Sequence, residues 1–245
     1  MVKRIDVNAD LGEEMGFDAA IMRFISSCSI ACGGHAGNPD TIREAVMQAQ
    51  SYGLRIGAHP SYPDPENFGR IKMEILPSAL ENSVKAQIQL VTGQLNRMGV
   101  PLHHVKFHGA LYNEACVDSV LAQLLVSLLR SEFPGAKLYA PYASEMAAAA
   151  GSVGVEVWYE GFVDRRYHPD LTLVKRSEEG AVLKSWVEIR EQVEELLLRQ
   201  RVRTSDGSWK AIWVDTLCLH GDHPEALHTA RNLNQWIQHH GMVTR

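Results

Sequence analysis

Segments with the two-residue repeat of a strand alternate with segments that have the helical repeat along the whole chain. Apolar and polar residues alternate from Ile5 to Asp10, for example, and apolar residues recur at helical spacing from Ile42 to Ala49. This alternation indicates a parallel sheet, because parallel neighbours need a crossover connection that is usually a helix. About seven strands fit into the chain in this way. A seven- or eight-stranded α/β barrel and an open doubly wound sheet both satisfy the pattern.

The expected elements follow from this periodicity and from turn residues. Strands are expected at 5–11, 27–31, 54–58, 104–107, 137–140, 155–159 and 215–219, with a hairpin within 202–214 about Asp206-Gly207. Helices are expected at 18–25, 39–52, 77–98, 119–133, 144–150, 186–199 and 224–239. Asn38 is expected to cap the second of these helices, with Pro39 as its first residue.

Composition narrows the class of protein. No linker or low-complexity tract divides the chain, so residues 1–245 are expected to form a single domain. A net charge of -5 argues against a nucleic-acid surface. The four cysteines are too few for a disulfide framework, no signal peptide is expected, and no apolar run is long enough for a membrane helix. Reduced thiols and a cytoplasmic location are therefore expected.

Ionisable side chains come at or directly after the ends of most of the expected strands. In α/β barrels and open parallel sheets, ligands bind beyond the carboxyl ends of the strands. Four histidines share this placement, so we expect them to converge at one active site. The residues in these positions are Asp10, Glu13, His35, His59, His108, Glu160, Asp164, His220 and Asp222.

The first strand carries three polar residues, Asp6, Asn8 and Asp10, on one face. Aspartate and asparagine are depleted in strands, so this face points to a site. Lys106 is expected to face inward from another strand. It would form a buried ion pair with Asp6 or Asp10, stabilise an oxyanion, or do both.

The residues leave two kinds of site open. Asp10, His59 and His108 could hold Zn²⁺ or a similar ion, or they could work as metal-free acid–base groups. The chain has no H-E-x-x-H motif, and His220-x-x-His223 is a common loop spacing. The sequence therefore favours a site that requires no metal. It also lacks the phosphate-binding loop, the dinucleotide-binding motif and the G-x-S-x-G motif.

Five stretches carry a family resemblance. They are DVNADLGE (6–13), ACGGHAGNP (31–39), GAHPSYPD (57–64), VKFHGALYN (105–113) and HGD (220–222). In this order they resemble the LamB/YcsF family, the A subunits of prokaryotic 5-oxoprolinase. The resemblance runs from residue 5 to about residue 240 and includes Asp164-Arg165-x-Tyr167. The sequence departs from the family pattern at Gly34, Asn67 and Phe107, and the first and last of these are expected to line the pocket.

The resemblance implies a seven-stranded β/α barrel related to the glycoside hydrolase/deacetylase superfamily. It also implies ATP-dependent opening of 5-oxo-L-proline to L-glutamate together with B and C subunits. Because this chain has no phosphate-binding loop, ATP is expected to be a co-substrate bound largely by those partner subunits.

Roles for individual residues follow as a hypothesis from this resemblance. Asp10, oriented by His59 or His220, would activate water. Lys106 would hold developing negative charge, and His108 would protonate the ring nitrogen.

The substrate itself would be held by other residues. Arg70 or Arg165 would pair with its carboxylate, since a guanidinium binds a carboxylate bidentately. The other expected substrate contacts are Asp6, Asn8, Glu13, His35, Asp164 and Asp222.

Two other functions stay open at this stage. One is a metal-dependent carbohydrate deacetylase or amidohydrolase that acts without ATP, as the superfamily suggests. The other is a non-catalytic subunit whose cleft binds a lactam or a sugar. The number of ionisable groups disfavours the second, because a binding cleft needs few of them.

Overall fold

A closed barrel of parallel strands organises the chain. The computed structural model describes residues 4–14, 16–221 and 225–244. Among these residues, seven parallel strands, β1 to β6 and β9, follow one another around the barrel. Closure comes from β1, which pairs with β2 on one side and with β9 on the other. The expected α/β barrel is confirmed, and the open sheet is excluded.

The bounds of the elements agree with most of the expected ones. The strands are β1 (Arg4–Leu11), β2 (Ser27–Ala31), β3 (Arg55–His59), β4 (His104–Val105), β5 (Lys137–Pro141), β6 (Val157–Phe162), β7 (Arg201–Arg203), β8 (Trp209–Ala211), β9 (Thr216–Leu219) and β10 (Val243–Thr244). The helices are α1 (Asp18–Ile21), η1 (Met22–Phe24), α2 (Pro39–Ser51), α3 (Pro77–Arg97), α4 (Gly109–Ala115), α5 (Ser119–Glu132), α6 (Glu145–Val153), α7 (Trp186–Leu198) and α8 (Ala226–His239).

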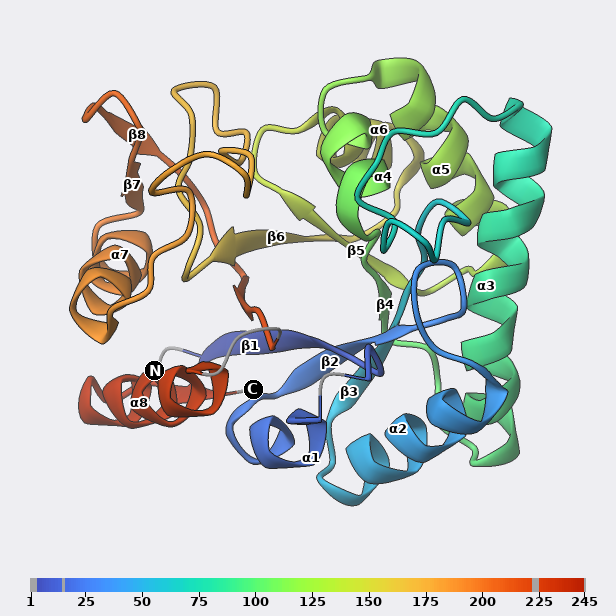
Figure 1. Cartoon of the computed structure of the whole chain (residues 1–245), viewed down its shortest axis with the longest axis horizontal. Coiled ribbons are helices and arrows are strands. Elements are labelled where there is room, and N and C mark those ends of the chain that lie inside the picture. The colour runs from blue at the N-terminus through green and yellow to red at the C-terminus, as the bar shows by residue number, and fades with distance from the viewer. Residues whose placement is uncertain (1–3, 15, 222–224, 245) are drawn as a thin grey trace.

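Helices lie around the outside of the barrel (Figure 1). Helix α2 shows why they form where they do. The Asn38 side chain accepts hydrogen bonds from the backbone N–H groups of Asp40 and Thr41, and Pro39 occupies the first turn. The apolar stripe from Ile42 to Ala49 is buried, and α2 packs against β2 and β3. Each large aliphatic side chain buried in this way contributes about 1.5–3 kcal/mol.

The end of α6 corrects one expected boundary. The helix continues through Gly151 and ends at Val153, because Gly154 adopts the left-handed conformation that caps a helix (φ 76°). Strand β6 consequently begins at Val157 and extends to Phe162. Glu160 therefore lies within the strand rather than beyond its end, and its side chain is fully buried.

Two short elements were not expected from the sequence, and one strand is shorter. Helix α4 follows β4 directly, with His108 as its N-cap. Strand β10 lies parallel to the start of β1, where Val243 is opposite Arg4. Strand β4 has only two residues, although the N–H of Lys106 still donates to the carbonyl of Ala58 on β3 at 3.0 Å.

The polar face of β1 points into the barrel at three depths. Asp6 is opposite Thr216 at the start of β9, Asn8 is opposite Cys218, and Asp10 is opposite Ser29 on β2. Because parallel strands run the same way, Asp6 lies nearest the amino ends of the strands and Asp10 nearest their carboxyl ends. One strand therefore supplies polar groups to separate layers of the barrel.

Asp6 belongs to a structural network at the amino end of the barrel. Its Oδ2 accepts from the hydroxyls of Ser27 and Thr216, both at 2.6 Å, and its Oδ1 from that of Ser26 at 3.0 Å. Arg55 lies 3.5 Å from the same carboxylate. Asp6 is absent from the pocket lining. The expected contact of Asp6 with the substrate is therefore replaced by contacts that join β1, β2, β3 and β9.

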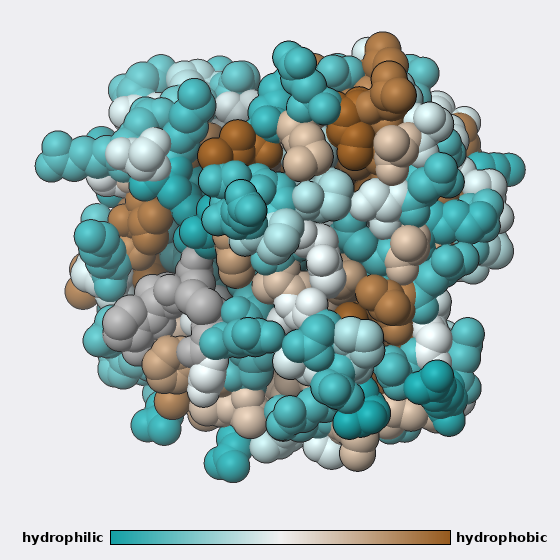
Figure 2. Space-filling model, turned by 45° about the vertical axis from the view of Figure 1, so that its right-hand side comes forward, coloured by the Kyte–Doolittle hydropathy of each residue, from teal (hydrophilic) through white to brown (hydrophobic). Residues whose placement is uncertain are grey.

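The outer surface is mainly hydrophilic in the view of Figure 2, where hydrophobic side chains occur as separate patches. Among the described residues, no helix has both the length and the apolar character that crossing a membrane requires.

Candidate active site

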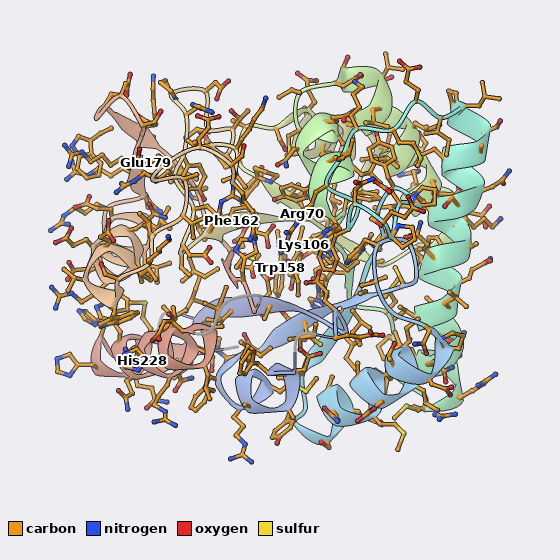
Figure 3. All side chains as sticks on the ribbon, in the orientation of Figure 1. Arg70, Lys106, Trp158, Phe162, Glu179 and His228 are labelled. Atoms are coloured by element: carbon orange, nitrogen blue, oxygen red, sulfur yellow. The ribbon has the colours of Figure 1, made fainter. Side chains whose placement is uncertain are left out.

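A pocket of about 980 Å³ opens at the carboxyl ends of the barrel strands. Its floor and walls bring together residues from β1, β3, β5 and β6 and from the segments that follow β4 and β9. Figure 3 shows Lys106, Phe162 and Arg70 near the centre of the molecule, and all three line the pocket. The expected site residues that line it are Asp10, Glu13, His59, Arg70, Lys106, His108, Arg165 and His220.

Lys106 is the central cation of the site. Its ammonium nitrogen lies 3.0 and 3.1 Å from the two oxygens of Asp10 and 2.9 Å from Glu160 Oε1. It also donates to Asn8 Oδ1 at 3.3 Å and to Cys218 Sγ at 3.0 Å. Burial alone would lower the pKa of Lys106, but these acidic neighbours raise it well above its ordinary value. The side chain is thus a fixed positive charge at the pocket floor.

Asp10 is the anion that faces the pocket. Burial favours its neutral form, but His59 and Lys106 more than offset this and hold its pKa well below the ordinary value. His59 Nε2 lies 3.4 Å from Asp10 Oδ2. An ionised carboxylate between an ammonium and an imidazole can orient a water molecule and accept a proton from it.

Glu160 is a functional side chain to which the sequence assigned no role. Its Oε2 accepts from the hydroxyl of Tyr112 at 2.8 Å, and its Oε1 accepts from Asn8 Nδ2 at 3.0 Å. With Lys106 as a third partner, this fully buried carboxylate is held from three directions. Its position at the end of an expected strand placed it among the candidate site residues, but nothing in the sequence indicated these partners.

Three histidines and a glutamate gather beside Asp10. Glu13 Oε1 lies 3.1 Å from His35 Nε2, 3.6 Å from His108 Nδ1 and 3.9 Å from His59 Nε2. The ring of His35 stacks on that of His108, with centroids 3.7 Å apart and planes inclined by only 4°. The structure therefore brings together four expected site residues that lie far apart in the sequence.

The charge states of these rings differ. Burial lowers the pKa of His35 despite its bond to Glu13, and burial together with His59 and His35 lowers that of His108 well below its ordinary value. Burial would also lower the pKa of His59, but the facing Asp10 carboxylate raises it. His59 is consequently the ring of this group that most favours a positive charge.

His220 stands on the other side of Asp10, at the end of β9. Its Nδ1 lies 2.8 Å from Asp164 Oδ1, and its ring stacks against Phe162. Burial would raise the pKa of Asp164, but His220 lowers it below its ordinary value. Asp164 is buried behind His220 and is absent from the pocket lining, so it orients the imidazole instead of touching substrate.

Other expected site residues have different positions. Asn8 lies beneath the pocket, where it binds both Lys106 and Glu160. Arg70 and Arg165 both line the pocket wall, and the Arg165 guanidinium donates to the carbonyl of Val174. Asp222 lies outside the described residues.

The three positions that depart from the family pattern also differ in placement. Phe107 lines the pocket, as expected. Gly34 does not line it, because it packs against Gln87 and Ser61, where a Cβ would come within 2.4 Å of their side-chain oxygens. Asn67 bonds Asp64 within the loop after β3.

Among the residues that the structure describes, two groups of side chains have the composition and spacing of metal ligands. They are Glu13 with His35, His59 and His108, and Asp10 with Cys218 and His220; the candidate ligand atoms of each group lie within 4.8 Å of one another. Carboxylate oxygens with imidazole nitrogens suit Zn²⁺ and similar ions, so the first group fits such an ion. The second group includes a thiol that already accepts from Lys106.

Comparison with known proteins identifies the family. The model of the LamB/YcsF family matches residues 5–245. The chain belongs to the LamB/YcsF family. A lactam utilization protein from Thermus thermophilus is 34% identical in sequence, with a TM-score of 0.91 and 99% of each chain covered.

More distant structures share only the fold of this LamB/YcsF protein. A protein from Enterococcus faecalis V583, provisionally described as a cellobiose-phosphate cleavage protein, is 14% identical with a TM-score of 0.62. The match covers 100% of this chain and 97% of that one. A GH18 chitinase from Pseudoalteromonas aurantia is 10% identical with a TM-score of 0.53, and 94% of this chain and 99% of that one are covered. The likeness to these two structures therefore concerns the barrel fold alone.

Proposed function

We propose that this chain is the lactam-hydrolysing A subunit of an ATP-dependent 5-oxoprolinase, which converts 5-oxo-L-proline to L-glutamate. Membership of the LamB/YcsF family and the similarity to a lactam utilization protein support this substrate class. The observation that carries the proposal is the Asp10 carboxylate, which lies between the Lys106 ammonium and His59 in the pocket wall. Such a site can activate water and hold negative charge beside a carbonyl carbon.

The chemistry explains why ATP is needed. A five-membered lactam is a resonance-stabilised amide whose ring closure is favourable, so its hydrolysis has to be driven. Transfer of the terminal phosphate of ATP to the carbonyl oxygen would release ADP and give an activated imidate. Addition of water and cleavage of the C–N bond would then give an acyl phosphate. A second water would release phosphate and glutamate.

The residues of this chain would act in the water steps. Asp10 would orient the attacking water and accept its proton, and Lys106 would hold the negative charge that develops on oxygen. The ring nitrogen needs a proton as the C–N bond breaks. His220 is better placed than His108 to supply it, because the Asp164 carboxylate orients the His220 ring through Nδ1, whereas both nitrogens of His108 face other protein groups.

The nucleotide is assigned to partner subunits. The chain has no phosphate-binding loop, so we propose that B and C subunits bind ATP and carry out the phosphoryl transfer. The pocket of about 980 Å³ exceeds what a small lactam fills. Its remaining volume leaves room for a phosphorylated substrate or for a segment of a partner that delivers it.

A reconstitution experiment tests the proposed function. The purified chain is mixed with its B and C subunits, ATP and 5-oxo-L-proline, and glutamate and phosphate are measured, with each component omitted in turn. Equal amounts of glutamate and phosphate that require every component are expected. A verified complex that forms no glutamate would contradict the proposal.

One observation favours a second candidate function. The convergence of Glu13, His59 and His108 resembles in composition the sites of metal-dependent amide hydrolases. Activity of the isolated chain on N-acetyl sugars without ATP would support a carbohydrate deacetylase. Unchanged turnover by the complex after alanine replacement of Asp10 and Lys106 would instead indicate a non-catalytic binding subunit.

A further inference from the structure

The hydrogen bonds of His59 and His108 imply that a proton or a metal cation lies between the two rings. His59 Nδ1 lies 2.8 Å from the carbonyl oxygen of Lys106, and His108 Nε2 lies 2.9 Å from that of Phe68. A carbonyl oxygen only accepts, so each of these ring nitrogens carries a hydrogen. If both rings are neutral, the other two nitrogens carry lone pairs.

Those two nitrogens, His59 Nε2 and His108 Nδ1, lie 3.0 Å apart. Two lone pairs at this distance repel unless a proton or a metal cation lies beside both. A carbonyl that fixes the distal N–H of a histidine is also the usual outer support of a metal-binding imidazole. The pair therefore has the arrangement of two metal ligands with their supporting carbonyls.

A carboxylate completes the set. Glu13 Oε1 lies 3.6 Å from His108 Nδ1 and 3.9 Å from His59 Nε2. Ligand atoms that surround a tetrahedral ion at about 2.0–2.1 Å are about 3.3 Å from one another. The three separations among Glu13, His59 and His108, from 3.0 to 3.9 Å, bracket that value.

The charges around the pocket floor favour a dication over a proton. The carboxylates of Asp10, Glu13 and Glu160 contribute -3, and the ammonium of Lys106 contributes +1, which leaves -2 with neutral histidines. One proton would leave a negative charge in this buried region, whereas a divalent ion would balance it.

We propose that Glu13, His59 and His108 bind one divalent transition-metal ion, Zn²⁺ being typical of two imidazoles with a carboxylate. Asp10 Oδ2 lies beside this triplet, 3.4 Å from His59 Nε2. When bound, the ion would supply a water of lowered pKa.

His35 would position a ligand without being one itself. Its Nε2 lies 3.1 Å from Glu13 Oε1 and would fix that carboxylate. The stacked, almost parallel rings of His35 and His108 cannot both direct in-plane lone pairs at one ion. The Nδ1 of His35 is buried without a hydrogen-bond partner among the described residues, consistent with the Nε2–H form of the ring.

Metal binding by the isolated chain tests the proposal. Protein stripped with a chelator is titrated calorimetrically with Zn²⁺ and spectroscopically with Co²⁺. One ion per chain is expected, with a visible Co²⁺ band of four-coordinate type. Glu13→Gln and His108→Asn are each expected to weaken Zn²⁺ binding by about 100-fold or more, and His35→Gln by about 10- to 100-fold, as for an outer support.

A matched control is His220→Asn, which removes a ligand candidate from the second group only and is expected to leave Zn²⁺ binding unchanged. Circular dichroism of the metal-free variants checks folding. If His108→Asn does not fold, Glu13→Gln tests the proposal by itself, because glutamine has nearly the same shape as glutamate. Absence of binding overturns the proposal, and so does binding that His220→Asn abolishes while Glu13→Gln retains it.

The catalytic use of the ion, though not its binding, rests on the proposed function. Full glutamate production by a complex assembled from verified metal-free chain would overturn the catalytic use of the ion and leave the proposed function intact. Stoichiometric Zn²⁺ binding with no glutamate from a verified complex would overturn the proposed function and leave the inference of metal binding intact.

Discussion

The Lys106 ammonium lies 2.9 Å from Glu160 Oε1, and Glu160 is fully buried and absent from the pocket lining. Glu160 is held in turn by the hydroxyl of Tyr112 and the amide of Asn8. The lysine is therefore both kept charged and fixed in direction by a carboxylate that does not itself line the pocket.

Glu160→Gln is expected to reduce kcat of the reconstituted complex by about 10- to 100-fold, because Lys106 loses one of its two carboxylates. The lost charge also lowers the pKa of Lys106, so the alkaline limb of the rate–pH profile should move to lower pH. Glu156→Gln is the control, since Glu156 forms a surface pair with Lys137 just before β6. An unmoved alkaline limb with a reduced rate would indicate a purely structural role for Glu160.

Asp10→Asn is expected to lower turnover by about 10²- to 10⁴-fold, the usual contribution of a general base. The amide has nearly the shape of the carboxylate, and Lys106 keeps its bond to Glu160. Melting temperature and binding to the partner subunits should therefore change little. Glutamate release by the complex measures the effect, and near-normal turnover would rule out water activation by Asp10.

His104 should make the protein sensitive to acid. Burial, with His103 and Lys106 nearby, lowers its pKa well below 6.5, so the folded state keeps it neutral. Below pH 6.5 the unfolded chain binds a proton there and the folded chain does not, so stability falls as pH falls.

The free energy of unfolding should fall by at most about 1.4 kcal/mol for each pH unit below 6.5. His104→Gln should flatten that part of the stability–pH curve, measured by urea denaturation between pH 7 and pH 5. His228→Gln is a matched control, because His228 lies on the surface helix α8 and bonds Asn232 there. Parallel curves for wild type and His104→Gln would contradict the prediction.

Gly109→Ala is expected to destabilise the fold by about 1–3 kcal/mol, because a Cβ there would lie 2.4 Å from the carbonyl oxygen of Gly69 at a φ of +57°. Gly93→Ala is the control. A Cβ at Gly93, on the exposed side of α3, meets no atom within 4 Å, so alanine should stabilise by up to about 1 kcal/mol. Thermal denaturation of both variants measures the difference, and equal effects would exclude the steric explanation.

Local signals were sufficient for much of the fold. The Asn38 cap and the proline at position 77 predicted the first residues of α2 and α3 correctly. The placement of ionisable groups at strand ends predicted which side chains would meet, and His59, His108 and His220 do line one pocket. These predictions succeeded because caps and strand ends depend on neighbouring residues only.

Local sequence signals do not predict how deep inside the barrel a side chain lies. Period-two alternation places Asp6 and Asp10 on the same face of the strand. It does not show that Asp6 belongs to a structural network and that Asp10 lines a pocket. Glu160 was expected after its strand, because nothing local shows that Gly154 rather than Gly151 ends the preceding helix. Its partners Lys106 and Tyr112 come from distant parts of the sequence, so only the fold reveals its position.

The pairing of β1 with β9 has a consequence for how the protein is made. Asp10 is synthesised about 200 residues before His220, and the strand that separates β1 from β6 is β9 itself. Until that strand leaves the ribosome, β1 has an unpaired edge, and the polar groups of its inner face lack part of their enclosure. Chains that terminate just before residue 216 should therefore be targets for chaperones and proteases, and they would have no assembled active site although they contain the other six strands of the barrel.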